Sequence, residues 1–138
     1  MGRTEHQAVA AVLLATFATL AACGVREESR TAPSPSPVVQ IEEAQRAVES
    51  LCRLQISGIA EGEAAAAFGV AHDSLHEIAA AVETLDRSSA ARLLEAKSVV
   101  EVALEAADTT SGFVRSVRVL EDRTIEALTV LGISTRGC

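Results

Sequence analysis

The chain has 138 residues, a formal net charge of −7 at pH 7, three phenylalanines, and no tryptophan or tyrosine. An acidic surface repels phosphate backbones, and the chain has few aromatic side chains on which bases could stack. Composition and charge therefore exclude nucleic acid from the partners that we expect.

Residues 1–23 have the layout of a secretory signal. A short polar opening contains Arg3, an apolar run covers residues 8–22, and small residues stand at the end of that run. The run is shorter than the roughly 20 residues that a permanent membrane-spanning helix needs. We therefore predict that residues 1–22 are a cleaved signal peptide.

The end of this segment, Leu20-Ala21-Ala22-Cys23, resembles the lipobox of bacterial lipoproteins. The resemblance implies that the Cys23 thiol carries diacylglycerol and that Cys23 becomes the mature amino terminus. The protein would then be anchored to a cell membrane on its periplasmic or extracellular side. Two acyl chains hold a protein on a bilayer stably, whereas one chain does so only marginally. The alternative is an ordinary cleaved signal with a chance cysteine beside the cut.

Residues 24–37, GVREESRTAPSPSP, follow the predicted lipidation site and contain all three prolines of the chain. Proline fixes φ and has no amide hydrogen, so alternating Ser and Pro favour extended, polyproline-like backbone over helix or sheet. We predict that residues 23–37 form a disordered linker. At about 3.1 Å per residue it reaches roughly 40 Å from the lipid.

Residues 38–138 suffice for one small domain. This segment is rich in Ala, Leu, Val, Glu and Arg and lacks proline, which favours helices over strands. Its first helical stripe consists of Ile41, Ala44, Val48, Leu51, Gln55 and Ile59, with Cys52 and Ile56 beside it. Gly58 and Gly62 weaken the pattern, so we expect the first helix to end between Ile59 and Glu61.

Three more stripes follow in order. The second consists of Phe68, Ala71, Leu75, Ile78, Ala79, Val82 and Leu85, and its phase fails at residues 86–89, where short polar side chains offer a helix cap. The third consists of Leu93, Ala96, Val100, Ala103 and Ala107, with Leu94, Val99 and Leu104 beside it. After a turn at residues 108–112, the fourth consists of Phe113, Val117, Leu120, Leu128 and Leu131, and it stops at Gly132.

Four amphipathic segments joined by short turns predict an all-α fold, a small antiparallel four-helix bundle. The weakest join is at residues 86–89. If the chain does not turn there, the second and third segments fuse into one long helix, and the domain is a three-helix bundle.

The cysteines add a constraint. With Cys23 assigned to lipid, Cys52 and Cys138 remain, and disulfides persist outside the cytoplasm. We predict a Cys52–Cys138 disulfide, which would stabilise the domain by on the order of 4–5 kcal/mol on the chain-entropy model. The alternative is two unpaired thiols. Zinc binding by this pair alone is less favoured, because two ligands do not close a zinc site.

His72 and His76 form the one candidate metal site. They are spaced i, i+4, so their rings project from one helix face about one turn apart. Such a pair can chelate a divalent metal, and Glu83 on the same flank offers a third ligand. However, the glutamate of H-E-x-x-H is missing. The alternative is a polar boundary against the next helix, in which a histidine is bonded to a carboxylate.

Motifs for other chemistries are lacking. The sequence has no C-x-x-C-H, no G-x-S-x-G and no phosphate-cradling glycine loop, so we expect neither an enzyme nor a cofactor apart from a possible metal. We interpret several carboxylates as solvated helix faces, namely Glu63, Glu77, Glu83, Glu95, Glu101 and Glu105.

Two functional hypotheses remain. The first is a lipid-anchored, non-enzymatic helical module that binds a protein or another component of the cell envelope. The second is an extracytoplasmic metal-binding protein that uses His72 and His76.

Overall fold

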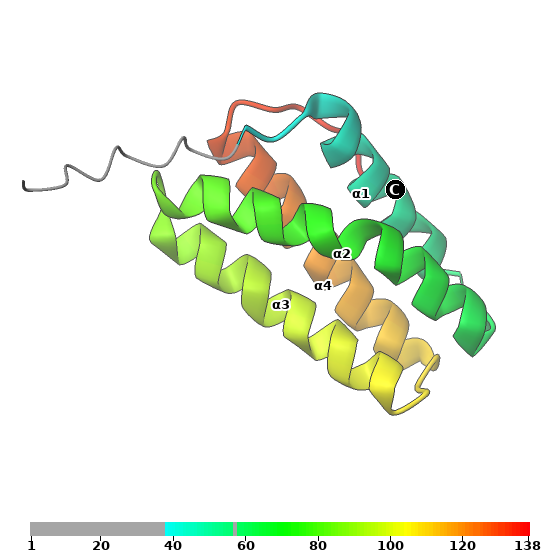
Figure 1. Ribbon diagram of the computed structural model, residues 1–138. Coiled ribbons are helices and arrows are strands. Elements are labelled where there is room, and N and C mark those ends of the chain that lie inside the picture. The colour runs from blue at the N-terminus through cyan, green and yellow to red at the C-terminus, as the bar shows by residue number, and fades with distance from the viewer. Residues whose placement is uncertain (1–37, 57) are drawn as a thin grey trace, which may run out of the picture. The chain divides into compact units, whose positions relative to one another are not determined.

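The structure is a computed structural model that describes residues 38–56 and 58–138, and the predicted signal peptide, Cys23 and the linker lie outside the described residues. The described part contains four helices, α1 (Ile41–Leu54), α2 (Glu61–Glu83), α3 (Arg87–Glu105) and α4 (Ser111–Val130). Figure 1 shows consecutive helices running in opposite directions, and α1 also packs against α4. The predicted all-α, antiparallel four-helix bundle is confirmed.

The chain turns between α2 and α3, so the three-helix alternative is wrong. Asp86 stands at the N-cap of α3, where its carboxylate accepts hydrogen bonds from the backbone N–H groups of Ser88 (3.0 Å) and Ser89 (3.1 Å). The hydrogen bond from the Ser89 hydroxyl, together with these backbone bonds and the bond from the Ser88 hydroxyl, lowers the pKa of Asp86 to about 2. The short polar residues that predicted a helix start therefore act as the cap.

Helix α1 ends earlier than the sequence predicted. Its last residue is Leu54, whereas we expected an end between Ile59 and Glu61. Gly58 adopts a left-handed φ of +76°, which suits glycine because it has no Cβ. Ile59 is buried from the loop rather than from the helix. An apolar residue in phase with the stripe therefore reaches the core without being helical.

Helices α3 and α4 end in the same way, with a residue of positive φ just past the helix. Behind α4 this residue is Gly132, and the next N–H, of Ile133, donates to the Leu128 carbonyl at 2.9 Å. Behind α3 the residue is Ala107, with a φ of 53°, and Asp108 N–H donates to the Ala103 carbonyl at 2.9 Å. Both ends have the Schellman hydrogen bond, but only α4 has the glycine that usually accompanies it.

The core consists mainly of small and branched aliphatic side chains together with Phe68 and Phe113. Thr124 is fully buried in it and donates its hydroxyl to the Leu120 carbonyl at 2.8 Å, which satisfies the polar group within its own helix. Three members of the core stripes are instead exposed at helix ends or in loops, namely Ile41, Leu85 and Ala107. Three of the residues beside the stripes are exposed as well, namely Ile56, Leu94 and Val99. The helical periods therefore identified the core better in the middle of each segment than at its ends.

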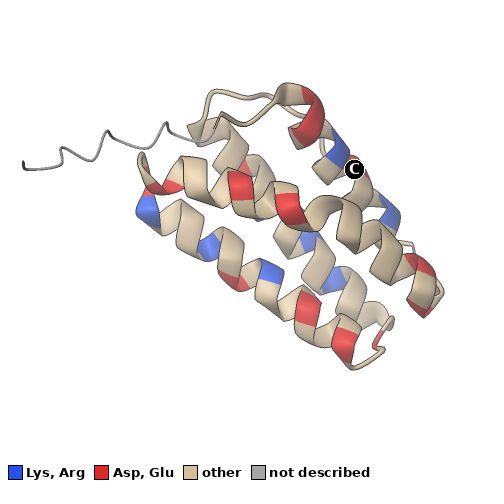
Figure 2. Cartoon of the chain, in the orientation of Figure 1, with Lys and Arg blue, Asp and Glu red and all other residues tan. Residues whose placement is uncertain are grey.

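Charge is distributed unevenly over the bundle. Helix α2 contains no lysine or arginine, as Figure 2 shows, and its acidic residues are Glu61, Glu63, Asp73, Glu77 and Glu83. Helix α4 instead carries both signs, with three arginines (Arg115, Arg118 and Arg123) and three acidic residues (Glu121, Asp122 and Glu126). None of the helices in the described residues has the length and apolar character needed to span a membrane.

Candidate functional site

The C-terminal tail, residues 132–138, leaves α4 and returns along α1 to Cys52 (Figure 1). Cys52 and Cys138 form a disulfide with their Cα atoms 5.5 Å apart, so the predicted bond is confirmed. A first helix that continued to residues 59–61, as the sequence predicts, would have Cys52 about halfway along it. Because α1 ends at Leu54, Cys52 instead lies in its last turn, and the tail passes most of the helix.

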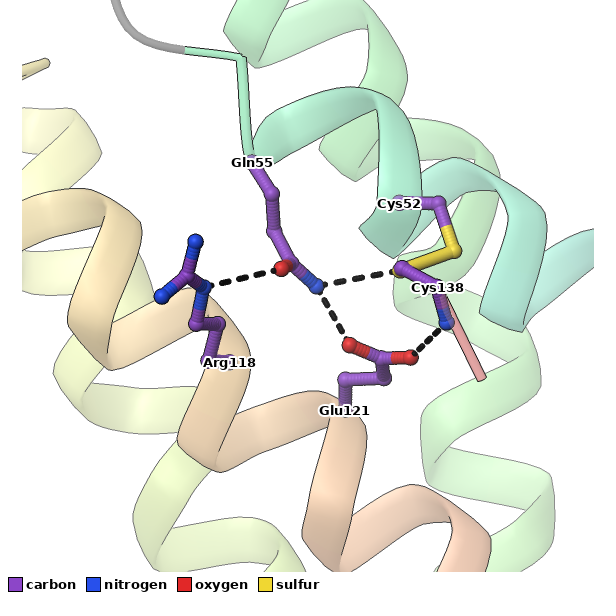
Figure 3. The surroundings of a disulfide bond; sticks show 5 residues. All are labelled: Cys52, Gln55, Arg118, Glu121 and Cys138. Atoms are coloured by element: carbon purple, nitrogen blue, oxygen red, sulfur yellow. Dashed lines mark hydrogen bonds between the residues drawn. A yellow bond between two sulfur atoms is a disulfide. The ribbon is translucent and has the colours of Figure 1, made fainter. Parts of the chain in front are cut away.

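A hydrogen-bond network surrounds the disulfide (Figure 3). Gln55 Nε2 donates to Glu121 Oε2 and, at 3.1 Å, to Cys138 Sγ, while its Oε1 accepts from Arg118 Nε at 3.2 Å. The backbone N–H of Cys138 donates to Glu121 Oε1 at 2.6 Å. The network therefore links the end of α1, the middle of α4 and the last residue of the chain.

Glu121 is the centre of this network and is buried, with 6% of the residue exposed. A buried carboxylate is costly unless hydrogen-bond donors satisfy its oxygens. Here each oxygen has one neutral donor, the Gln55 amide or the Cys138 backbone. One of these two donors depends on the bound tail, so tail docking and burial of Glu121 stabilise each other.

Gly137 allows the tail to approach α4 closely. A Cβ added at this position would lie 2.8 Å from Glu121 Oε1 and 3.2 Å from Ile125 Cδ1. Glycine therefore lets the backbone pass over Glu121 at this distance. Thr135, two residues earlier, has a buried hydroxyl with no hydrogen-bond partner, and it lines the cleft between the tail and α1.

One group of ligand-type side chains lies close together in residues 38–56 and 58–138. It consists of Cys52, Glu121 and Cys138, whose ligand atoms are all within 4.8 Å of one another. Both cysteine sulfurs are consumed by the disulfide and are not thiolates, which are the form that binds metal. The group is therefore a covalent and hydrogen-bonded fastening of the tail, and it offers no metal site while the bond is closed.

The predicted metal ligands His72 and His76 lie together on α2, with ring centroids 5.0 Å apart. His72 Nδ1 is 3.0 Å from Asp73 Oδ1, and its Nε2 is 3.1 Å from Glu101 Oε1 on α3. This is the polar boundary against the next helix that we gave as the alternative. Glu83 is farther along α2, near Arg87, and it does not join the two histidines within one coordination sphere.

Lys97 and Glu101 complete the polar boundary between α2 and α3. Lys97 is only 3% exposed, and its Nζ donates to Glu101 Oε1 at 2.6 Å. The Lys97 hydrogen bond is the main cause that lowers the pKa of Glu101, burial opposes it, and His72 adds to it. We had interpreted Glu101 as part of a solvated face. It is instead half-buried, because α2 and α3 enclose it between Lys97 and His72.

The carboxyl groups with a perturbed pKa in the described residues all have it lowered, and they are Asp86, Glu101, Asp108 and Glu126. In Glu126 the main cause is the hydrogen bond from Arg123, followed by that from Arg92. A general acid requires a raised carboxyl pKa. These four groups therefore act as ionised hydrogen-bond acceptors that cap or join helices.

Sequence reasoning missed Lys97 and Glu121, although each left a signal. Lys97 follows Leu93 by four residues and precedes Val100 by three, and Glu121 follows Val117 by four, so both fall on core stripes. A charged residue within an apolar stripe is costly to bury unless it is paired. Each such position predicts a partner, which for Lys97 is Glu101 one turn along the same helix and for Glu121 is Gln55 and the Cys138 backbone.

Comparison with known proteins gave no match, whether to a protein-family model, to a curated protein or to a solved structure. The functional assignment therefore rests on the residues of this chain.

Proposed function

We propose that the chain is a bacterial lipoprotein, anchored through Cys23 on the outer side of a cell membrane, with a helical domain that serves as a non-enzymatic binding module. The Cys52–Cys138 disulfide is the observation that carries this proposal. Disulfides of this kind persist outside the cytoplasm, where no reducing system keeps cysteines as free thiols. The bond also occupies two of the three cysteines and leaves the lipobox Cys23 as the one available for lipid.

The domain's chemistry supports a binding role over a catalytic one. Its lowered carboxyl pKa values, its tail fastening and its Lys97–Glu101 pair all contribute to the fold. A bundle of this kind presents helix faces to a partner, and the acidic α2 favours a partner with basic groups. We propose an envelope protein as that partner.

The anchor is tested by labelling growing cells of a bacterial host with a radioactive fatty acid and separating the protein into detergent and aqueous phases. Wild type should incorporate label and enter the detergent phase, because diacylglycerol supplies two acyl chains. Cys23→Ser should lose the label, because serine does not form the thioether.

The matched control is the double variant Cys52→Ser/Cys138→Ser, which keeps Cys23 and removes the other two sulfurs. It should be labelled as strongly as wild type. If the Cys23→Ser protein is labelled as strongly as wild type, the lipid is attached elsewhere, and if neither protein is labelled, there is no lipid. Either result would overturn the anchor at Cys23.

Metal binding by His72 and His76 is the second hypothesis, and the contacts of His72 disfavour it. The ring pair favours it, but coordination needs a free nitrogen lone pair on each ring, and both His72 nitrogens face carboxylates. We expect zinc to leave the melting temperature of the protein unchanged. A rise that disappears in His72→Ala/His76→Ala would establish the site, because a ligand bound only to the native state stabilises it.

A further inference from the structure

Helices α3 and α4 share an outer face with a row of exposed apolar side chains. Val99 of α3 is 52% exposed and Val119 of α4 is 45% exposed, and together with Ala96 they line a shallow groove of about 170 Å³. Val102 extends the row along α3. Single exposed valines are ordinary, but adjoining ones on two helices are typical of an interaction surface.

Arg115 lines this groove, and Glu95 lines a second hollow that adjoins it and shares Ala96, Val99 and Val119 with it. Arg92 and Arg123 line the same hollow as Glu95, and each lies 2.7 Å from a Glu126 carboxylate oxygen, which neutralises them in part. Glu95 and Arg115, in contrast, make no side-chain hydrogen bond or ion pair with the described residues, so both are available to a partner.

The two charges lie on opposite sides of the centre of this face. Glu95 stands one helical turn before Val99, and Arg115 stands one turn before Val119, on helices that run in opposite directions. The charges therefore lie on opposite sides of the point between the two valines. A two-fold axis that lies in the plane of the face, passes through that point and runs perpendicular to the line joining the two charges brings Glu95 of one copy opposite Arg115 of the other, twice.

We propose that this face binds a second copy of the chain as a symmetric dimer, with Val99 and Val119 near the two-fold axis. An interface of this symmetry must complement itself, and an apolar centre with one unpaired charge of each sign on either side does so. The valines supply apolar burial. The two Glu95–Arg115 pairs fix the register more than they add affinity.

The dimer is tested with the full-length chain in the envelope of a bacterial host, by cross-linking a thiol introduced as Val119→Cys with a short bismaleimide. A residue near a two-fold axis faces its own copy, so a band of twice the chain mass should form on reducing electrophoresis. Val70→Cys is the matched control and should give little dimer, because Val70 lies on α2 and, at 59% exposed, is at least as accessible as Val119.

Charge exchange provides the sharper comparison. In the Val119→Cys protein, Glu95→Arg and Arg115→Glu should each lower the cross-linked fraction about tenfold, because both symmetric pairs become repulsive. The double variant Glu95→Arg/Arg115→Glu should restore cross-linking, since each pair is again of opposite charge. Both residues are exposed on their helices, so the bundle itself should be unaffected.

Three results would overturn the dimer. If the double variant cross-links no better than the single variants, the two charges do not face each other. If Val119→Cys and Val70→Cys give equal dimer, the bands report random collision, and if Val119→Cys joins a different protein, that protein covers the face. Cross-linking in the chain without an introduced cysteine would instead report a free Cys23 thiol, which contradicts the lipid anchor and not the dimer.

Discussion

At the scale of single residues, the helix ends show where local chemistry decides conformation. Asp86 caps α3 with two backbone and two hydroxyl hydrogen bonds, and Gly132 lets the chain leave α4 with a positive φ. Ala107 performs the same turn after α3 although it has a Cβ. A left-handed φ costs a residue with a Cβ about 1–2 kcal/mol, so Ala107 retains strain that a glycine would not have.

Replacing Ala107 with glycine should therefore stabilise the protein. The relief of the left-handed conformation is partly offset by the greater backbone freedom of glycine in the unfolded chain, which leaves a net gain of about 0.5–1 kcal/mol. Urea unfolding monitored by circular dichroism measures this difference. The control is Ala106→Gly, one residue earlier, where φ is −82° and glycine should destabilise. If Ala107→Gly also destabilises, the strain that we assign to this position is absent.

At the scale of helices, the sequence predicted which segments are helical because apolar residues recur with the helical period. It failed at the end of α1, since Ile56 and Ile59 continue the period beyond the last helical residue. Periodicity reports the direction that a side chain would take in a helix, and a loop residue such as Ile59 can reach the same core. The disulfide could be predicted by counting cysteines, but the route of the tail over Glu121 depends on packing that no local pattern encodes.

The boundary between α2 and α3 depends on ionised Glu101. Because Lys97 lowers the pKa of Glu101 in the folded state, its contribution to stability is present above the ordinary pKa of 4.5 and is lost as the pH falls through the folded value. At pH 7 we expect Glu101→Gln to be less stable than wild type by about 1–2 kcal/mol.

The difference between wild type and Glu101→Gln should shrink as the pH is lowered from 7 to 3, because protonated Glu101 resembles the neutral amide. Urea unfolding of both proteins across this pH range measures the difference in their free energies of unfolding. The pH dependence that Asp86 and Glu126 contribute is the same in both proteins, so it cancels in the difference. Glu77→Gln on the exposed side of α2 is the control, and it should change stability little at any pH. A difference that is constant with pH would mean that the charge on Glu101 contributes nothing.

At the scale of the whole molecule, the disulfide joins the end of the chain to the first helix across a sequence separation of 86 residues. Helices α1 and α4 thereby gain a covalent link, in addition to their packing and the Gln55–Glu121 hydrogen bond. For a loop of this length the chain-entropy model gives on the order of 4–5 kcal/mol, and measured values are often lower. This is a large fraction of the stability of a small domain.

Non-reducing peptide mapping of the protein isolated from the envelope should find peptides containing Cys52 and Cys138 linked to each other. The Cys52→Ser/Cys138→Ser variant should melt lower by about 10 °C or more, because each kcal/mol corresponds to several degrees in a domain of this size. Free thiols at both positions in the isolated protein would sink the prediction.

A double-mutant cycle separates the covalent bond from the network around it. With the disulfide present, Glu121→Gln should cost about 1 kcal/mol, because an amide replaces a carboxylate oxygen that accepts from Gln55 or Cys138. Without the disulfide the tail is no longer held over Glu121, so the same substitution should cost clearly less. The coupling between the two changes measures how much of the buried Glu121 is satisfied by the tail. Equal costs in the two backgrounds would mean that Glu121 is stabilised independently of the tail. The disulfide would then act only by restricting the conformations of the unfolded chain.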